Sequence, residues 1–254
     1  RHCQRFLREI RATAQLAHPQ IVPILDTGFA DGRFYYAMRI IDGPGLDAFR
    51  LELARARTRA FPRATELAEA PTISDGSTPL AWIEWQRAGE TLRLHRALAV
   101  LVSKLARALD HAHRLGHLHR DVKPSNILLD IAGEPYLTDF GLCARVDAPN
   151  LTRSGEWAGT LRYTAPERLR GVEDARADVY SLGLCLYELL TGVEVYAGAT
   201  GPELLRRLST ETLCAPRRID PAIARDLETI VICATSQELA SRYASAADFA
   251  ADLD

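Results

Sequence analysis

The most regular pattern of apolar residues along the chain lies in residues 92–115, where they recur every three or four positions. This spacing places them on one face and predicts a long amphipathic helix. Gly116 follows directly and suits the end of a helix, because glycine readily adopts the left-handed conformation needed there. The apolar stripe consists of Leu94, Leu98, Leu101, Leu105, Leu109 and Ala112.

Similar spacing predicts a helix over residues 4–17, which ends before Pro19. Its apolar positions are Phe6, Leu7, Ile10, Ala14 and Ala17. Further helical patterns occupy residues 46–58, 178–191, 202–209, 221–235 and 244–253.

Two strand-like runs, 21–28 and 33–41, are joined by the short segment FADG, and the following DGPG at 42–45 breaks the chain. Two shorter apolar runs, 127–129 and 136–138, flank DIAGE, which is typical of a hairpin turn.

Residues 59–90 have no clear period and contain scattered Pro, Gly, Ser and Thr, which predicts an inserted, partly ordered loop whose role stays open. The order of elements is a small α/β part followed by a larger, mainly helical part. The sequence therefore predicts an α+β fold.

Composition narrows the class of protein. The 254 residues are 47% apolar and 25% charged, with a net charge of −2, which gives no sign of a nucleic-acid-binding protein. No apolar run approaches the ~20 residues that span a bilayer, and five cysteines without a CxxC pair fit a reducing cytoplasm. The chain begins with Arg1 inside a helical pattern, so we expect it to be part of a longer protein.

The segment HRDVKPSN at 119–126 carries the candidate chemistry. The carboxylate of Asp121 can accept a proton, the ammonium of Lys123 can neutralise a transferring phosphate, and the amide oxygen of Asn126 can bind a divalent metal. Phosphoryl transfer depends mostly on such positioning and charge neutralisation. Alone, this segment is more typical of a solvated surface loop. Three later motifs favour the chemical interpretation: DFG at 139–141, GTLRYTAPE at 159–167 and DVYSLG at 178–183.

With these motifs in this order, the chain resembles eukaryotic-type protein kinases of the bacterial serine/threonine branch. The stretch from Arg225 to Leu253 also resembles kinases of planctomycete-type bacteria. The resemblance covers essentially the whole chain and implies a two-lobed kinase fold. It implies a partial small lobe in residues 1–41, with the Glu9 helix and two strands, and a mainly helical large lobe in 42–254 that contains the insertion.

The resemblance also implies roles for single residues. Asp121 would be the catalytic base and Lys123 would contact the γ-phosphate of ATP, a pattern that points to Ser/Thr rather than Tyr substrates. Thr160 would connect to both of these residues. Asn126 and Asp139 would hold Mg²⁺ or Mn²⁺.

On the nucleotide side, Glu9 would pair with a strand lysine and Met38 would lie at the back of the adenine pocket. The backbones of Arg39 and Ile41 would bind adenine, and Leu128 would pack beneath the ring. Without the family, Met38 and Leu128 would be ordinary core residues, and Glu9 would be one charge on a solvated helix face.

Structural and regulatory roles follow in the same way. Glu167 would pair with Arg242, and Asp178 would hold the backbone of the catalytic loop. Arg120 would need an anionic partner, which in this family is often a phosphorylated activation loop. Thr152 and Ser154 are therefore predicted autophosphorylation sites, with exposed loop hydroxyls as the alternative. The remaining motif residues are His119, Phe140 and Gly141.

A Gly-rich GxGxxG loop and a strand lysine do not occur in this sequence, whose only lysines are Lys104 and Lys123. We therefore expect a fragment of an active kinase, weakly active or inactive by itself. The alternatives are a pseudokinase scaffold and, less favoured because of GTLRYTAPE and Arg242, a small-molecule phosphotransferase. The expected partners are ATP and Ser/Thr proteins, and the resemblance allows for dimerisation during autophosphorylation. The expected location is cytoplasmic, with any membrane segment outside this chain.

Overall fold

The computed structural model describes residues 16–30, 33–60, 91–140 and 161–254. Most of the predicted 4–17 helix, most of the predicted insertion and the segment 141–160 lie outside these residues. Leu16 and Ala17, the last two residues of the predicted 4–17 helix, are not helical. Their neighbour His18 precedes Pro19, a position that disfavours helical backbone, and the His18 carbonyl accepts from the Ile21 N–H at 3.1 Å in a turn.

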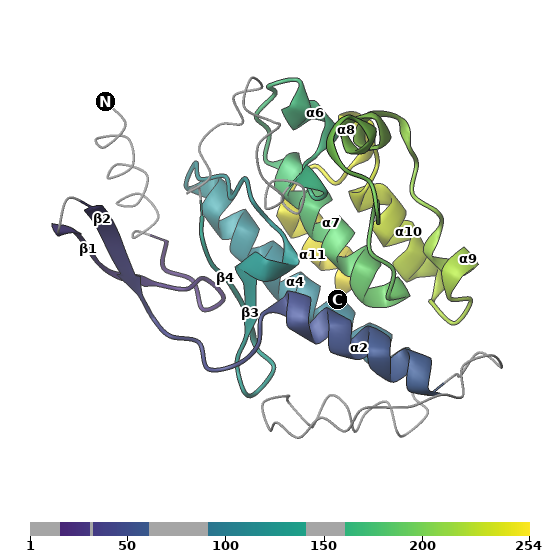
Figure 1. The fold of residues 1–254 in the computed structure, drawn as a ribbon, viewed down its shortest axis with the longest axis horizontal. Coiled ribbons are helices and arrows are strands. Elements are labelled where there is room, and N and C mark those ends of the chain that lie inside the picture. The colour runs from purple at the N-terminus through teal and green to yellow at the C-terminus, as the bar shows by residue number, and fades with distance from the viewer. Residues whose placement is uncertain (1–15, 31–32, 61–90, 141–160) are drawn as a thin grey trace.

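Four helices form the centre of the large helical part (Figure 1). They are α4 (Thr91–Arg114), α7 (Arg176–Thr191), α10 (Arg225–Ala234) and α11 (Ala246–Leu253). Helix α4 packs against both α7 and α11, and α10 packs against α7. The predicted stripe of α4 is buried, and Leu98, Leu105 and Leu109 are fully inaccessible. The pattern in the sequence thus correctly predicted which face of α4 meets the core.

Helix α4 ends where the sequence predicted. Gly116 adopts the left-handed conformation (φ 80°), and the His117 N–H donates to the Ala112 carbonyl at 2.9 Å. This bond satisfies a carbonyl that has no partner within the helix. The chain then turns directly into the candidate catalytic segment.

The remaining helices are shorter or peripheral. Helices α2 (Leu46–Ala60) and α8 (Gly201–Thr210) match predicted segments, whereas α6 (Pro166–Leu169) and α9 (Pro216–Ile219) were not predicted. Four residues make about one helical turn, too few to show a hydrophobic period. Helix α10 begins at Arg225 rather than at 221, because the Asp220 carboxylate accepts from the Ala222 N–H at 2.9 Å and closes a turn instead.

Strands β1 (Ile24–Ala30) and β2 (Arg33–Met38) form an antiparallel pair in which Tyr36 lies opposite Thr27. The prediction began the first strand at 21 and ended the second at 41, and both limits were wrong. Ile21 instead forms a parallel bridge to Leu137, and the Val22 N–H donates to the Leu137 carbonyl at 2.9 Å. Residues 21–22 therefore bind the second sheet before the chain enters β1.

That second sheet consists of β3 (Ile127–Leu129) and β4 (Pro135–Leu137), antiparallel, with Leu128 opposite Tyr136. Its predicted hairpin turn is closed by Asp130, whose carboxylate accepts from the N–H groups of Ala132 and Glu134, both at 2.9 Å. In Figure 1 this hairpin lies between the β1–β2 pair and the helices.

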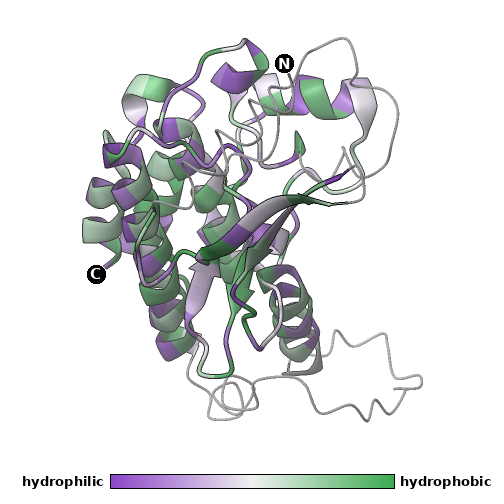
Figure 2. Ribbon diagram, turned by 90° about the vertical axis from the view of Figure 1, so that its left-hand side faces the viewer, coloured by the Kyte–Doolittle hydropathy of each residue, from purple (hydrophilic) through white to green (hydrophobic). Residues whose placement is uncertain are grey.

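Hydrophobic and hydrophilic residues alternate around the helices in Figure 2, as expected where each helix turns one face to a shared core. A small strand-containing part followed by a mainly helical part confirms the predicted α+β fold class. Among the described helices, none is both long and apolar enough to cross a membrane.

Gly183 fixes how closely α7 approaches the end of α10. A Cβ atom at this position would lie 2.8 Å from the Ala234 Cβ and 3.0 Å from the Thr235 Cγ2. Ala234 is fully buried and cannot rotate away. Overpacking costs about 1–3 kcal/mol, whereas alanine gains about 1 kcal/mol of helix propensity.

We therefore expect Gly183→Ala to lower the free energy of unfolding by up to about 2 kcal/mol, measured by urea denaturation. Val100→Ala, on the exposed side of α4, is the control and is expected to change stability by less than about 0.5 kcal/mol. A Gly183→Ala protein about 1 kcal/mol more stable than its parent would show the full gain in helix propensity, and therefore that α7 and α10 can separate without cost.

Candidate active site

Three polar residues of the segment after α4 lie together. The side-chain nitrogen of Asn126 donates to the main-chain carbonyl and to the Oδ2 of Asp121, both at 2.9 Å. The Lys123 Nζ lies 2.8 Å from the same Oδ2. Asp121 and Asn126 are both buried, so these contacts hold the carboxylate in one orientation. The structure therefore brings together the carboxylate, the lysine and the amide that the sequence singled out.

The carboxylate of Asp178, in the first turn of α7, binds the backbone of this segment. Its Oδ2 accepts from the His119 N–H at 2.8 Å, and its Oδ1 accepts from the Arg120 N–H at 2.9 Å. His113, in the last turn of α4, places its Nε2 2.8 Å from Oδ2. Burial by itself would raise the pKa of Asp178, but the His113 hydrogen bond, the neighbouring histidines and the backbone donor outweigh it and lower that pKa.

Arg120 has a left-handed backbone (φ 69°), which is uncommon for a residue with a side chain. Its carbonyl accepts a hydrogen bond from the Arg168 guanidinium. Its own Nε donates to the Glu173 Oε2 at 2.8 Å. The anionic partner that the sequence predicted for Arg120 is thus, among the described residues, a carboxylate in the loop between α6 and α7. The predicted sites Thr152 and Ser154 lie outside the described residues.

Asp139 and Phe140 follow β4. Asp139 also has a left-handed backbone (φ 61°), and its Oδ1 accepts from the Tyr36 hydroxyl at 2.8 Å. Partial burial and this hydrogen bond raise the pKa of Tyr36 to about 12. Phe140 is buried, and its ring centroid lies 4.3 Å from that of His119, whose pKa is lowered by burial. Gly141 lies outside the described residues.

Glu167 and Arg242 form a buried bidentate ion pair, with N–O distances of 2.6 and 2.7 Å. The Arg242 Nε also donates to the Ser236 carbonyl at 2.6 Å, and its guanidinium lies 4.6 Å from the centroid of the Tyr180 ring. Because each charge is desolvated, the pair requires this full set of partners. It ties α6 to the segment before α11.

The residues predicted for the nucleotide side lie near the junction of the two sheets. Met38 accepts a weak hydrogen bond at its sulfur from the Thr138 Oγ1 at 3.4 Å. The Arg39 N–H donates to the Pro23 carbonyl at 3.2 Å, while its side chain lies over the Tyr136 ring. Ile41 and Leu128 are half-buried. Glu9 and Thr160 lie outside the described residues, so their predicted roles stay predictions.

The donor set fits a hard divalent cation. Both hydrogen bonds of the Asn126 amide use its nitrogen, so its oxygen is the atom available to a metal, and Tyr36 occupies only one oxygen of Asp139. Mg²⁺ prefers oxygen ligands and keeps several waters, so two protein side chains suffice. In the part of the chain that the structure describes, no cluster of three His, Cys, Asp or Glu side chains offers a metal site.

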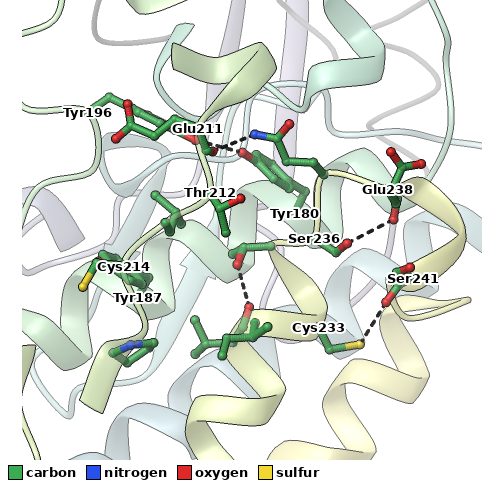
Figure 3. A pocket seen from close by; sticks show the side chains of 16 residues that line it. Tyr180, Tyr187, Tyr196, Glu211, Thr212, Cys214, Cys233, Ser236, Glu238 and Ser241 are labelled. Carbon is green, nitrogen blue, oxygen red and sulfur yellow. Dashed lines mark hydrogen bonds between the residues drawn. The ribbon is translucent and has the colours of Figure 1, made fainter. Parts of the chain in front are cut away.

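A separate cavity of about 380 Å³ lies between α7, α10 and the segment 211–216. Figure 3 shows Tyr187 and Tyr196 toward one side, Tyr180 in the middle, and Cys233 next to Ser241 toward the other side. None of the residues predicted for catalysis or nucleotide binding lines it. This cavity and the candidate active site are therefore different places.

Comparison with protein families matches residues 83–241 to the protein kinase domain. The chain belongs to the protein kinase family. The match includes the catalytic loop, the DFG segment and Glu167, and it ends one residue before Arg242.

Individual relatives of this kinase domain are bacterial. The serine/threonine-protein kinase PknH of Mycobacterium tuberculosis (strain ATCC 25618 / H37Rv) is 32% identical over 248 residues, covering 97% of this chain and 34% of PknH. PrkC of Bacillus subtilis (strain 168) is 30% identical over 252 residues, covering 98% and 33%. PknL of M. tuberculosis (strain ATCC 25618 / H37Rv) is 36% identical over 251 residues, covering 94% and 59%. The predicted resemblance to bacterial Ser/Thr kinases is confirmed, and the kinase chain spans about a third of PknH and PrkC.

The residues of the kinase site that were not predicted from the sequence include Tyr36, His113 and Glu173. Tyr36 shares a strand face with Met38, so alternation along the strand could have identified it. His113 lies in the last turn of α4, which directs it toward the following loop. Glu173 belongs to no motif, and only the folded loop shows its contact with Arg120.

The substitution Asp178→Asn tests whether the Asp178 carboxylate stabilises the backbone of the catalytic loop. Removing one member of a buried charged network costs about 3–5 kcal/mol, and we expect a loss of unfolding free energy of that size at pH 7. Because the folded pKa lies below the ordinary value of about 3.9, the carboxylate contributes fully above that value and loses its contribution as pH falls through the folded pKa. The difference between the two proteins should therefore shrink in acid.

Urea denaturation at several pH values measures this difference. Asp110→Asn is the matched control, because Asp110 pairs with the exposed Arg114 on the surface of α4 and should contribute less than about 0.5 kcal/mol. A stability difference for Asp178→Asn that stays constant between neutral and acidic pH would contradict the assigned role.

Proposed function

We propose that the protein containing this chain transfers the γ-phosphate of ATP to Ser or Thr hydroxyls of protein substrates. The observation that carries this proposal is the buried cluster of Asp121, Lys123 and Asn126. A solvated surface loop would not direct a lysine and an amide at one buried carboxylate. Membership of the kinase family, whose members generally use ATP and a divalent metal, supports the same chemistry.

Each residue of the site would have its own role in the reaction. Bound together, ATP and Mg²⁺ supply the phosphoryl group and neutralise part of its charge. Asp121 orients the attacking hydroxyl and accepts its proton, since the Asn126 amide holds its carboxylate in place. Lys123 exchanges its contact with Asp121 for an oxygen of the transferring phosphate. The Asn126 oxygen and the Asp139 carboxylate hold the metal.

Protein rather than small-molecule substrates are favoured by the segment after residue 160. Its Tyr163 hydroxyl donates to the buried Glu188 at 2.9 Å, and Glu188 also pairs with Arg50 of α2 at 3.2 Å. Together with the Glu167–Arg242 pair, these contacts fix residues 161–167 against the helical core, next to the catalytic loop. A segment held in one conformation at this place suits the positioning of an extended peptide.

Asp121→Asn should lower the rate of phosphate transfer by at least about 100-fold, because general base catalysis contributes about 10²–10⁴-fold. The assay uses the full protein, radiolabelled ATP and Mg²⁺, and identifies the modified acceptor residues by mass spectrometry. Asp226→Asn, an exposed carboxylate in the first turn of α10, is the control. A parent protein that folds, binds ATP and transfers no phosphate to any Ser or Thr would favour the pseudokinase alternative.

A further inference from the structure

A single hydrogen bond joins strand β2 to the DFG segment across the candidate active site. The Tyr36 hydroxyl donates to the Asp139 Oδ1 at 2.8 Å, although the two residues are 103 positions apart in the sequence. Tyr36 belongs to the β1–β2 pair and Asp139 to the segment that follows β4. The contact therefore connects the strand part of the chain to the part that carries the catalytic loop.

Packing sets the position of the Tyr36 hydroxyl. Tyr36 and Met38 are two residues apart and project from the same face of β2, and Met38 contacts the adjacent Thr138. The space they share with Val22, Ile24 and Phe140 is only about 10 Å³. That volume holds about one water molecule. One side of the partly buried Tyr36 ring therefore lines a tight space, and its hydroxyl contacts Asp139.

The chemistry of the donor matters as much as its position. A phenol donates one hydrogen bond, so it occupies Oδ1 and leaves Oδ2 of Asp139 available. Such a bond limits the rotation of the carboxylate. A lysine or arginine in the same place would add a positive charge that competes with a cation for the carboxylate. Tyr36 adds none.

We propose that Tyr36 is a positioning residue for the metal. Its hydroxyl binds Oδ1 of Asp139 and so fixes the carboxylate with Oδ2 directed toward the metal. This inference deepens the proposed function and rests on the role of Asp139 as a metal ligand. The two roles differ: Asp139 would bind the metal itself, whereas Tyr36, on the β1–β2 sheet, would act only through Asp139.

Tyr36→Phe removes the hydroxyl and keeps the ring that fills the confined space. In the full protein that contains this chain, with saturating ATP, we expect this variant to bind Mn²⁺ about five- to tenfold more weakly, measured by electron paramagnetic resonance. That change corresponds to about 1–1.4 kcal/mol, the usual net value of a hydrogen bond. With saturating Mg²⁺, the turnover rate should fall less than about twofold, since the metal concentration compensates for the weaker site.

Tyr35→Phe is the matched control. Tyr35 precedes Tyr36 on β2, projects from the opposite face and is exposed. Mn²⁺ binding by Tyr35→Phe should therefore match that of the parent protein. Thermal unfolding of both variants tests whether they remain folded.

The outcomes separate this inference from the proposed function. If Asp139→Asn leaves Mn²⁺ binding unchanged, the proposed metal role of Asp139 is wrong. If Asp139→Asn abolishes Mn²⁺ binding while Tyr36→Phe leaves it unchanged, only the inference about Tyr36 is overturned. Tighter Mn²⁺ binding in Tyr36→Phe would also overturn it, because the hydroxyl would then obstruct the metal. A loss of turnover or stability with unchanged Mn²⁺ binding would reduce Tyr36 to a structural residue.

Discussion

The buried carboxylate of Asp178 is the interaction on which the candidate active site depends. It accepts hydrogen bonds from two consecutive backbone N–H groups, those of His119 and Arg120, immediately before Asp121. Burying a charge is costly unless it is fully paired, and here the backbone donors and His113 supply that pairing. The left-handed backbone of Arg120 is maintained by the same contacts. The orientation of Asp121 thus follows from the packing of α7 against α4.

A second buried pair performs a similar task for the neighbouring segment. Glu167 and Arg242 are 75 residues apart, and their ion pair fixes the start of α6 against the C-terminal helices. Such pairs add little net stability, since desolvation offsets the attraction. Their value here is geometric, because the catalytic loop and the start of α6 are each held to the same helical core.

Sequence patterns predicted the parts of the fold that local physics determines. The α4 stripe, the turn at Gly116 and the β3–β4 hairpin each follow from spacing and turn chemistry within a few residues. The motifs also identified Asp121, Lys123, Asn126 and Asp178, which the structure brings together. Their catalytic roles remain predictions until they are tested.

What the sequence did not predict depends on contacts between distant segments. The pairing of Ile21 and Val22 with Leu137 displaced the start of β1, because a strand-like run cannot indicate which sheet it joins. The Tyr36–Asp139 hydrogen bond could not be predicted from the sequence for the same reason, since it depends on the relative position of two sheets. Glu173 resembles any exposed loop carboxylate until the fold places it beside Arg120.

Arg120 makes two contacts of different strength, one through its backbone and one through its side chain. Its backbone is held by the buried Asp178, which salt hardly screens, whereas its guanidinium meets Glu173 near the surface, where ion pairs contribute about 0–1 kcal/mol. The side chain can therefore exchange one anion for another at little cost while the loop backbone keeps its shape. Ionic strength and the local supply of anions would act on the partner of Arg120 and leave the position of Asp121 unchanged.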